Sequence, residues 1–384
     1  MDDARLKCLC CGALALATLS RYRAIPRVSS DCKPVSAGGE LFFCAACGHI
    51  QKAATAAFLQ DIERIYRDYD SYYQGGGLEQ MVADENGARA RRSNVLVRRL
   101  DVVSALPPKG RCIDIGCGRG AFLRALAERE RGLLLYGLEL DRRNLAEFER
   151  IPGFKALFCG EPNDIPGAYD LISMIHALEH MLDPRATLEA LRKKLTPGGL
   201  LFIEVPNVEE NPFDLVIADH ASHFTPRTLD VLLAETGFER LTLSTEWVKK
   251  EISVLARTTE TPVGRPLADC ASTFLTHQLN WLENTLDHAH KAARSAPFGL
   301  FGTSIAAVWL TAALADQIDF YLDEDEERQG RYFFGKPVLH PEQAPHGSTV
   351  FVGLAPAIAA QIAERLRRLG LRTVLPPDLL VSLP

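Results

Sequence analysis

Two pairs of cysteines near the start of the chain have the spacing of a metal site. Cys8 and Cys11 form one CxxC-Gly unit, and Cys44 and Cys47 form a second one about thirty residues later. Each unit presents two thiolates on one side of a tight turn, and two units complete the tetrahedral set of sulfur ligands that Zn²⁺ prefers. Because four protein ligands leave no open position for a substrate, we expect a structural zinc ion here.

Other cysteines leave alternatives to this assignment. Cys10 lies inside the first unit and could replace one ligand, whereas Cys32 lies between the two units and is expected to be a free thiol. The four cysteines could also be two unrelated pairs of buried thiols. Ten cysteines in a chain of 384 residues without a secretory leader favour metal ligation and buried thiols over disulfides, and a cytosolic location.

A glycine-rich turn is the second candidate site. Asp114 lies in a short apolar strand, and Gly116, Gly118 and Gly120 follow it before an expected helix. Glycines permit positive φ and a close approach of a ligand to the backbone, and the helix would point its free amides at that ligand. The spacing also fits a dinucleotide fingerprint, so NAD is an alternative. Asp114 favours S-adenosylmethionine (SAM), because a carboxylate repels a pyrophosphate but suits the cationic methionine end of SAM.

Acidic residues follow the next two expected strands. Glu139 ends an apolar strand 25 residues beyond Asp114, a separation at which a carboxylate can bind both ribose hydroxyls of a nucleoside. Glu161 and Asp164 follow a third strand at 155–159. We interpret these two as candidates to contact an adenine amino group.

Two histidines and a tyrosine complete the candidate cofactor site. His176 and His180 follow a strand at 169–175, at the edge where open α/β sheets bind ligands. His176 is a candidate cofactor contact, although both histidines could instead close the strand end by packing. Tyr73 belongs to a tyrosine- and glycine-rich loop at 69–77 that could cover a bound ligand. The alternative for this loop is a linker whose tyrosines pack on a neighbour.

The composition is that of a globular protein. The net charge of −6 argues against non-specific binding of nucleic acid, and 47% hydrophobic residues with 24% charged residues argue against disorder. The apolar runs at 12–19 and 299–315 are shorter than the ~20 residues that a membrane-spanning helix needs. We therefore expect no nucleic-acid partner and no membrane partner.

Alternating strands and helices from residue 111 onwards indicate an α/β fold with a parallel sheet. An antiparallel edge strand is expected within 246–256. A segment rich in threonine and proline follows at 258–266, and then a long amphipathic helix at 267–293. A strand, a glycine turn at Gly302 and another helix come next. This pattern indicates a second, smaller doubly wound unit.

Five motifs in a fixed order carry a family resemblance. They are Asp-Ile-Gly-Cys-Gly-Arg-Gly at 114–120, Gly-Leu-Glu-Leu-Asp at 137–141, His-Ala-Leu-Glu-His at 176–180, Pro-Gly-Gly at 197–199 and Glu-Val-Pro-Asn at 204–207. Together they resemble a class I SAM-dependent methyltransferase. A dinucleotide dehydrogenase would share the fold class but is not expected to carry these motifs in this order.

The segments on either side extend the resemblance. A double-CxxC module before the core and a smaller α/β unit after it resemble the zinc-containing C-methyltransferases that act on nucleotide-linked deoxysugars. The resemblance implies a zinc-ribbon-like module at 1–70, a class I methyltransferase Rossmann-like domain at 71–257 and a smaller C-terminal Rossmann-like domain at 258–384. It also implies that a nucleotide-sugar lies between the two α/β units.

The catalytic loop of that family reads roughly Tyr-His-Glu-His-Phe-Ser-Tyr-Phe-Ser, and residues 217–225 match it. The match puts Asp219 and His220 where the family has Glu-His, and His223 where it has tyrosine; the family's first Tyr-His is Ile-Ala here. His220 could remove a proton from a carbon next to a keto group or from a sugar hydroxyl, with Asp219 holding or polarising it. His223 could be a second polar contact or a packed loop histidine. Ordinary methyltransferases also carry a histidine here that frames the site.

The sequence therefore predicts transfer of a methyl group from SAM to a nucleotide-activated sugar or a related glycan precursor. Methylation at carbon is favoured over methylation at oxygen. One alternative is a non-catalytic module that binds SAM or a nucleoside and docks a partner, because the base loop departs from the family pattern. Another is an NAD(P)-dependent sugar-nucleotide enzyme. The expected assembly is a monomer or a homodimer.

Overall fold

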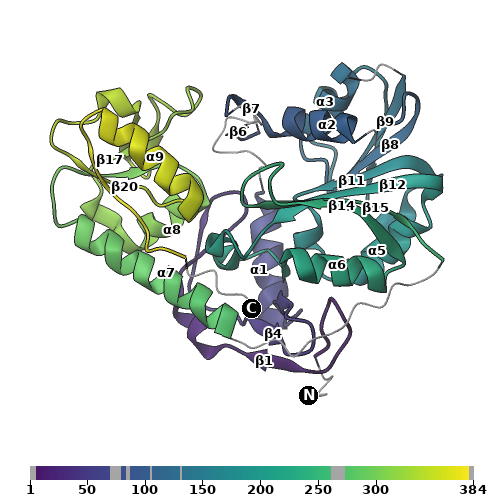
Figure 1. Cartoon of the computed structure of the whole chain (residues 1–384), viewed down its shortest axis with the longest axis horizontal. Helices are drawn as coiled ribbons and strands as arrows, with labels where there is room; N and C mark the ends of the chain where they lie inside the picture. Colours follow the sequence, from purple (N-terminus) through teal and green to yellow (C-terminus); the bar gives the residue numbers. More distant parts are fainter. Residues whose placement is uncertain are drawn as a thin grey trace.

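The computed structural model describes residues 6–69, 79–83, 87–103, 106–129, 132–260 and 273–379. Two α/β units lie side by side, and the N-terminal segment lies beneath and between them (Figure 1). Tyr73 and most of its predicted loop fall outside the described residues.

The larger unit is built on a seven-stranded sheet in the order β10-β9-β8-β11-β12-β15-β14. The first five strands are parallel, and β15 runs antiparallel to both of its neighbours. The strands are β8 (Gly110–Ile115), β9 (Leu133–Glu139), β10 (Phe154–Cys159), β11 (Tyr169–Ile175), β12 (Leu195–Pro206), β14 (Phe238–Ser244) and β15 (Glu251–Thr258).

The antiparallel part of this sheet differs from the prediction of one edge strand within 246–256. The structure has β15 in the second half of that stretch and β14 just before it, and β15 lies inside the sheet with β14 at the edge. β15 is almost entirely buried, as an interior strand must be, whereas β14 is half-exposed. Because β14 carries polar residues, its sequence does not clearly indicate a strand. Its place in the sheet becomes evident only from its pairing with β15.

Helices cover both faces of the sheet, as Figure 1 shows. On one face α2 (Arg92–Val102) and α3 (Ala121–Arg129) pack in one core, and on the other α5 (Pro184–Arg192) and α6 (Pro226–Glu235) pack in a second core. A short helix, α4 (Leu145–Phe148), precedes β10. Thr225 caps α6 by accepting a hydrogen bond from the amide of Thr228, and Gly237, at φ +79°, follows its end. Thr225 and Gly237 are of the types that helix starts and helix ends favour.

The N-terminal segment forms a small sheet that also includes one strand from the loop after β12. Its order is β1-β4-β5-β13. β1 (Leu16–Thr18), β4 (Phe42–Cys44) and β5 (Ile50–Gln51) come from the N-terminal segment, whereas β13 (Ser222–His223) belongs to the loop after β12. A hairpin of β2 (Arg27–Val28) and β3 (Pro34–Val35) and the helix α1 (Ala56–Arg67) complete this part of the chain. The predicted base loop is therefore part of the cysteine-bearing sheet.

The C-terminal unit is a second, smaller doubly wound fold, with strand order β18-β19-β17-β16-β20-β21. Helices α7 and α8 pack in the core on one face and α9 in the core on the other. The elements are α7 (Thr273–Ala292), β16 (Phe298–Phe301), α8 (Ile305–Leu314), β17 (Phe320–Leu322), β18 (Tyr332–Phe333), β19 (Lys336–Leu339), β20 (Thr349–Phe351), α9 (Pro356–Arg368) and β21 (Arg372–Val374).

Contacts between the parts hold the two α/β units in place. Trp309 of α8 donates from its indole nitrogen to the carbonyl oxygen of Pro26 over 2.9 Å, and its ring lies edge-on to Phe213 of the larger unit, with centroids 5.6 Å apart. A hairpin of β6 (Met81–Ala83) and β7 (Arg89–Arg91) reaches across from the other side, where Arg89 donates to the carbonyl oxygen of Glu324 over 2.8 Å.

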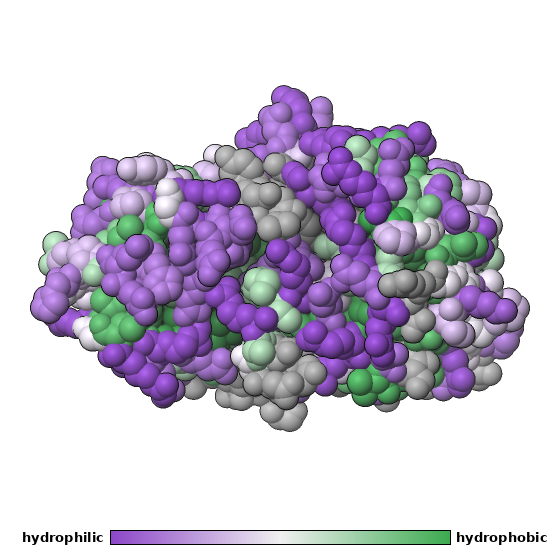
Figure 2. Space-filling view, turned by 90° about the horizontal axis from the view of Figure 1, so that it is seen from above, coloured by the Kyte–Doolittle hydropathy of each residue, from purple (hydrophilic) through white to green (hydrophobic). Residues whose placement is uncertain are grey.

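No helix of the described residues is both long enough and apolar enough to span a bilayer. Figure 2 shows a mostly hydrophilic face on which hydrophobic side chains gather only in small patches.

Candidate active site

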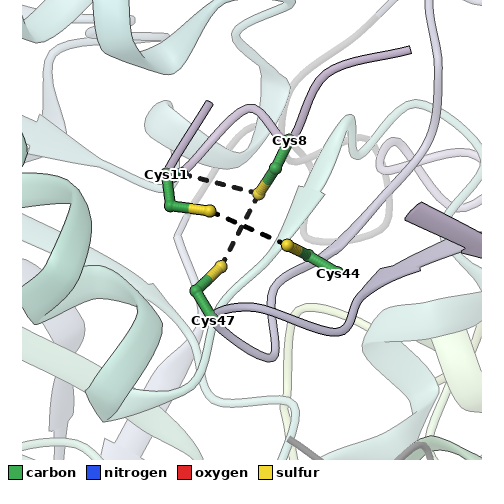
Figure 3. Close-up of side chains that lie close together, drawn as sticks. All are labelled: Cys8, Cys11, Cys44 and Cys47. Carbon is green, nitrogen blue, oxygen red and sulfur yellow. Dashed lines mark hydrogen bonds between the residues drawn. The ribbon is translucent and has the colours of Figure 1, made fainter. Parts of the chain in front are cut away.

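The four cysteines of the two CxxC units converge on one point (Figure 3). The sulfur atoms of Cys8 and Cys47 lie 3.6 Å apart, and those of Cys11 and Cys44 lie 3.7 Å apart. A tetrahedron with zinc–sulfur bonds of about 2.3 Å has edges of about 3.8 Å, so the arrangement fits a zinc ion. Cys10 points elsewhere, because its thiol donates to the carbonyl oxygen of Thr228 over 3.2 Å.

The glycine-rich turn after β8 has the backbone that the sequence predicts. Gly116, Gly118 and Gly120 have φ values of +69°, +54° and +75°, which side chains rarely adopt. A Cβ atom on Gly116 would lie only 2.8 Å from the Cβ of Ala177. The turn can therefore approach a ligand closely.

Two of the predicted cofactor carboxylates lie at this turn. Glu139 accepts hydrogen bonds from the amides of Gly118, at 2.7 Å, and Leu140, at 2.9 Å. Asp114 is buried and accepts a hydrogen bond of 2.7 Å from the hydroxyl of Ser173. Burial raises the pKa of Asp114 to about 7, although the bond from Ser173 acts in the opposite direction.

The candidate adenine contacts lie at the rim of the same edge. Asp164 belongs to a short 3₁₀ turn, Pro162–Asp164, that follows β10, and Glu161 precedes it. Both acids are exposed, whereas Pro162 is buried and fixes the turn. Their predicted contact with a nucleobase stays a prediction.

His176 lies at the end of β11 among three buried carboxylates. Its Nδ1 is 3.2 Å from Glu179, and its Nε2 is 3.6 Å from both Glu204 and Glu251. Burial and the guanidinium of Arg92 act to lower the pKa of His176, but the three carboxylates outweigh them and raise it to about 9. His176 is thus charged at neutral pH and unsuited to the role of a general base.

His180 and Asp219 join the larger unit to the N-terminal segment. Asp219 accepts hydrogen bonds from the amide and the hydroxyl of Ser30, at 2.8 and 2.5 Å. The Nδ1 of His180 lies 3.3 Å from Asp219 Oδ2 and 3.1 Å from the hydroxyl of Tyr66 in α1. Burial opposes ionisation of Asp219, yet His180, His220 and Ser30 together hold its pKa well below the usual range.

Asp214, which the sequence analysis does not single out, is the partner of His220. Its Oδ1 lies 2.7 Å from Nδ1 of His220, and its Oδ2 lies 2.7 Å from Nδ1 of His223. Sequence adjacency suggests Asp219 for the role of holding His220; in the structure Asp214 holds that place and Asp219 faces Ser30 and His180. Burial opposes ionisation of Asp214, but the two histidines keep its pKa well below the usual range.

His223 is enclosed by protein, and Lys52 lies on its far side. The Nε2 of His223 is 3.2 Å from the ammonium of Lys52, and none of the His223 side chain is exposed. Burial and then Lys52 lower the pKa of His223 to about 4. This geometry favours the packed loop histidine over the second polar contact.

Lys52 itself is 2% exposed and follows β5. Its ammonium also donates to the carbonyl oxygens of Ile217, at 2.6 Å, and His220, at 2.9 Å. Burial lowers the pKa of Lys52 to about 7, although Asp214 and Asp219 act to raise it. Lys52 therefore holds the base loop from the side of the cysteine-bearing sheet.

A comparison with known families identifies the larger unit. A family model described as "Methyltransferase domain" matches residues 88–243, the stretch that contains the glycine-rich turn and all five motifs. Residues 88–243 form a class I SAM-dependent methyltransferase domain. The alternative cofactor NAD is no longer supported, because the glycine-rich turn and the five motifs lie within the residues that the methyltransferase family model matches.

Relatives of the methyltransferase domain cover only part of the chain. A ubiquinone biosynthesis O-methyltransferase of Idiomarina loihiensis is 30% identical over 129 residues, covering 30% of this chain and 51% of the relative. One of Psychrobacter arcticus is 28% identical over 159 residues, covering 33% of this chain and 58% of the relative. The chain thus spans about half the length of the curated relatives it matches.

Solved structures of methyltransferases are similar to about half of the chain. An S-adenosylmethionine-dependent methyltransferase from Clostridium acetobutylicum has a TM-score of 0.36 at 13% identity, covering 53% of this chain and 98% of its own. The glycopeptide N-methyltransferase MtfA, complexed with SAM, has a TM-score of 0.36 at 15% identity, covering 43% of this chain and 94% of its own.

Asp214, Lys52 and Glu179 were not predicted as site residues from the sequence, but each lies against a predicted one in the structure. Asp214 lies three residues before the stretch that aligns with the family's loop, so the alignment does not include it. Lys52 had no signal in the sequence, because it lies about 170 residues from the loop that it holds.

Proposed function

We propose that this protein transfers the sulfonium methyl group of SAM to a small molecule, a nucleotide-activated sugar or a related glycan precursor. The observation that carries the proposal is the hydrogen bonding of the two ring nitrogens of His220. Its Nδ1 is taken by Asp214, and the described part of the chain forms no hydrogen bond to its Nε2. An imidazole fixed in this way, beside the ligand edge of a methyltransferase domain, is suited to activate an acceptor.

The cofactor pocket is assigned to the glycine-rich turn and its neighbours. Gly116, Gly118 and Gly120 give close access to the backbone, Asp114 is placed to meet the methionine ammonium, and Glu139 is placed to meet the ribose. SAM, when bound, supplies the electrophilic methyl group. The chain's own contribution is to orient the donor and acceptor in line. Glu161, Asp164, His176 and Tyr73 stay further candidate contacts.

The cysteine cluster is assigned a structural zinc ion held by Cys8, Cys11, Cys44 and Cys47. The sulfur–sulfur distances support it. Its role would be to fix the small sheet that pairs β5 with β13 and thereby the loop of His220. The proposed domains are a zinc-binding module at 1–70, the methyltransferase domain at 71–257 and a Rossmann-like domain at 258–384.

Two arguments bear on which acceptor atom receives the methyl group, and they favour different atoms. The resemblance to zinc-containing C-methyltransferases favours carbon next to a keto group, whose proton is acidic enough to be removed. The curated relatives are named as O-methyltransferases, which favours a hydroxyl oxygen. We keep carbon as the first choice and oxygen as the second candidate.

A transfer assay tests the proposal. The purified protein is mixed with SAM carrying a ¹³C-labelled methyl group and a panel of nucleotide-sugars and their keto derivatives. We expect one acceptor to gain the label, and the ¹³C chemical shift to tell a C-methyl from an O-methyl product. The variant His220→Ala should lose transfer but keep SAM binding. Tight SAM binding with no transfer to any acceptor would instead support a module that docks a partner.

A further inference from the structure

Glu179, His180 and His220 come together at the ligand edge of the methyltransferase domain. One ligand atom from each of these side chains lies within 4.8 Å of the other two. Glu179 and His180 belong to a 3₁₀ turn, Leu178–His180, directly after β11, and His220 comes from the loop before β13. We propose that these three side chains bind a divalent transition-metal cation, separate from the cysteine cluster.

The two imidazole rings have the arrangement that shared ligation requires. The rings of His180 and His220 are nearly perpendicular, at 84°, with centroids 4.6 Å apart. Around a cation with bonds of ~2.1 Å, neighbouring ligand atoms lie ~3–3.4 Å apart. The three ligand atoms lie within 4.8 Å of one another, so side-chain rotations would bring them onto one cation.

Each of the three side chains also contacts a polar partner outside the proposed metal site. The Nδ1 of His220 is bonded to Asp214 at 2.7 Å, and the Nδ1 of His180 lies 3.3 Å from Asp219. The Oε1 of Glu179 lies 3.2 Å from His176. A carboxylate on the remote nitrogen of a histidine fixes its tautomer and leaves Nε2 free to bind a metal, which is the usual environment of histidine ligands.

One carboxylate oxygen of Glu179 and the Nε2 atoms of the two histidines have no hydrogen-bond partner among the described residues. Glu179 is 1% exposed, and its Oε2 has no hydrogen-bond partner among the described residues. The described residues also provide no hydrogen bond to Nε2 of His180 or His220. A buried carboxylate oxygen without a partner is costly. A cation would satisfy this oxygen and both nitrogens at once.

The donor set selects the class of metal. Two imidazoles and one carboxylate suit Mn²⁺, Fe²⁺, Co²⁺ or Zn²⁺, whereas Mg²⁺ and Ca²⁺ prefer sets made of oxygen alone. The carboxylates of Glu179, Asp214 and Asp219 around the two rings add the negative charge that a divalent cation requires. Three protein ligands also leave positions open for an acceptor.

This inference deepens the proposed function and rests on it for its chemical consequence. An acceptor hydroxyl on the cation would lose its proton to solvent at a lower pH than in water, and its oxygen is then the nucleophile. A keto oxygen on the cation would instead make the neighbouring C–H group more acidic; loss of that carbon-bound proton to solvent gives an enolate, whose carbon is the nucleophile. A bond from the nucleophile to the methyl carbon forms as the sulfur–methyl bond breaks, and neutral S-adenosylhomocysteine leaves. His220 would act as a ligand in this step.

Binding of Mn²⁺ alone tests the site without SAM or an acceptor. Protein that holds one zinc per chain, with any second metal ion removed, is titrated with Mn²⁺, and the free ion is followed by electron paramagnetic resonance. We expect one saturable Mn²⁺ per chain in addition to the zinc. Glu179→Gln should abolish this binding, and Asp219→Asn should weaken it ~10–100-fold. His346→Ala, which removes an exposed histidine of the C-terminal unit, should bind as the wild type does.

The controls separate a lost site from a lost fold and from a failed function. Zinc content and SAM binding must stay normal in each variant, which shows that it is folded. No saturable Mn²⁺ in the wild type, or equal binding by folded Glu179→Gln, would overturn the metal site. A protein that binds Mn²⁺ through these residues but methylates nothing would retain the metal site and refute the proposed function.

Discussion

The ammonium of Lys52 donates a hydrogen bond to the carbonyl oxygen of His220 over 2.9 Å. A residue beside the cysteine-bearing sheet thus holds the residue that we propose to activate the acceptor. Lys52→Met should free the carbonyl oxygens of Ile217 and His220 and shift the loop. Because a displacement of about 1 Å can cost ~10²-fold in rate, we expect a loss of that order in methyl transfer with normal SAM affinity. The exposed Lys193→Met is the matched control, and equal rates for both variants would refute the role of Lys52.

Asp214 is the second support of the same loop. Asp214→Asn keeps the shape but removes the charge that both histidines share, and it turns an amide toward one of them. We expect a loss of ~1.5–3 kcal/mol in the free energy of unfolding, as for other hydrogen bonds to a buried charged group, and ~10²–10⁴-fold slower transfer. Urea unfolding and the transfer assay measure the two effects. An unchanged unfolding midpoint would show that the pairing contributes little.

A zinc ion bound to the four cysteines should stabilise the loop at 217–225 through the small sheet β1-β4-β5-β13. Cys44→Ser removes one sulfur ligand, so metal analysis should find less than one zinc per chain. Since β5 pairs with β13, amide hydrogen exchange at 217–223 should accelerate in this variant. Cys10→Ser is the matched control, because its sulfur lies outside the cluster, and it should keep both zinc and slow exchange. Full zinc content in Cys44→Ser would refute the four-cysteine site.

Asp114 should make both stability and cofactor affinity depend on pH. Its pKa is about 7 in the folded protein against an ordinary value of 3.8. Between these values the folded protein holds a proton that the unfolded chain has lost, so the free energy of unfolding contributed by this group falls as pH rises from 4 to 7. SAM affinity should rise from pH 6 to 8, because the ionised carboxylate attracts the methionine ammonium. Calorimetric titration measures the affinity, and Asp114→Asn should remove its dependence on pH.

Gly116 should not tolerate a side chain. Gly116→Ala would force Ala to φ +69° and place its Cβ 2.8 Å from the Cβ of Ala177. Gly198→Ala is a matched control, with φ +82° but no atom within 4 Å of the added Cβ, so it carries the backbone strain of ~1–2 kcal/mol alone. We expect Gly116→Ala to lose more stability than the control and to lose SAM binding. Equal melting temperatures for the two variants would argue against close packing at this turn.

The sequence by itself determined the features that are written in consecutive residues. The CxxC-Gly units, the Asp114 turn with its positive-φ glycines, the buried parallel strands and the cap at Thr225 all follow from local backbone preferences and periodicity. These features led to the prediction of a SAM site and to the class of fold. The antiparallel pair β14 and β15 was less predictable, because burial inside a sheet depends on the strand's neighbours.

Only the tertiary structure decided which side chains meet. Asp214 rather than Asp219 holds His220, because the loop turns Asp219 toward Ser30 and His180. Lys52 reaches His220 from about 170 residues away. Glu179 and His180 meet His220 because the turn after β11 pairs with the loop before β13, where the amide of Ala221 donates to the carbonyl oxygen of Glu179. Such contacts depend on how distant segments pack and on where each side chain points, and neither property is written in the spacing of residues along the chain.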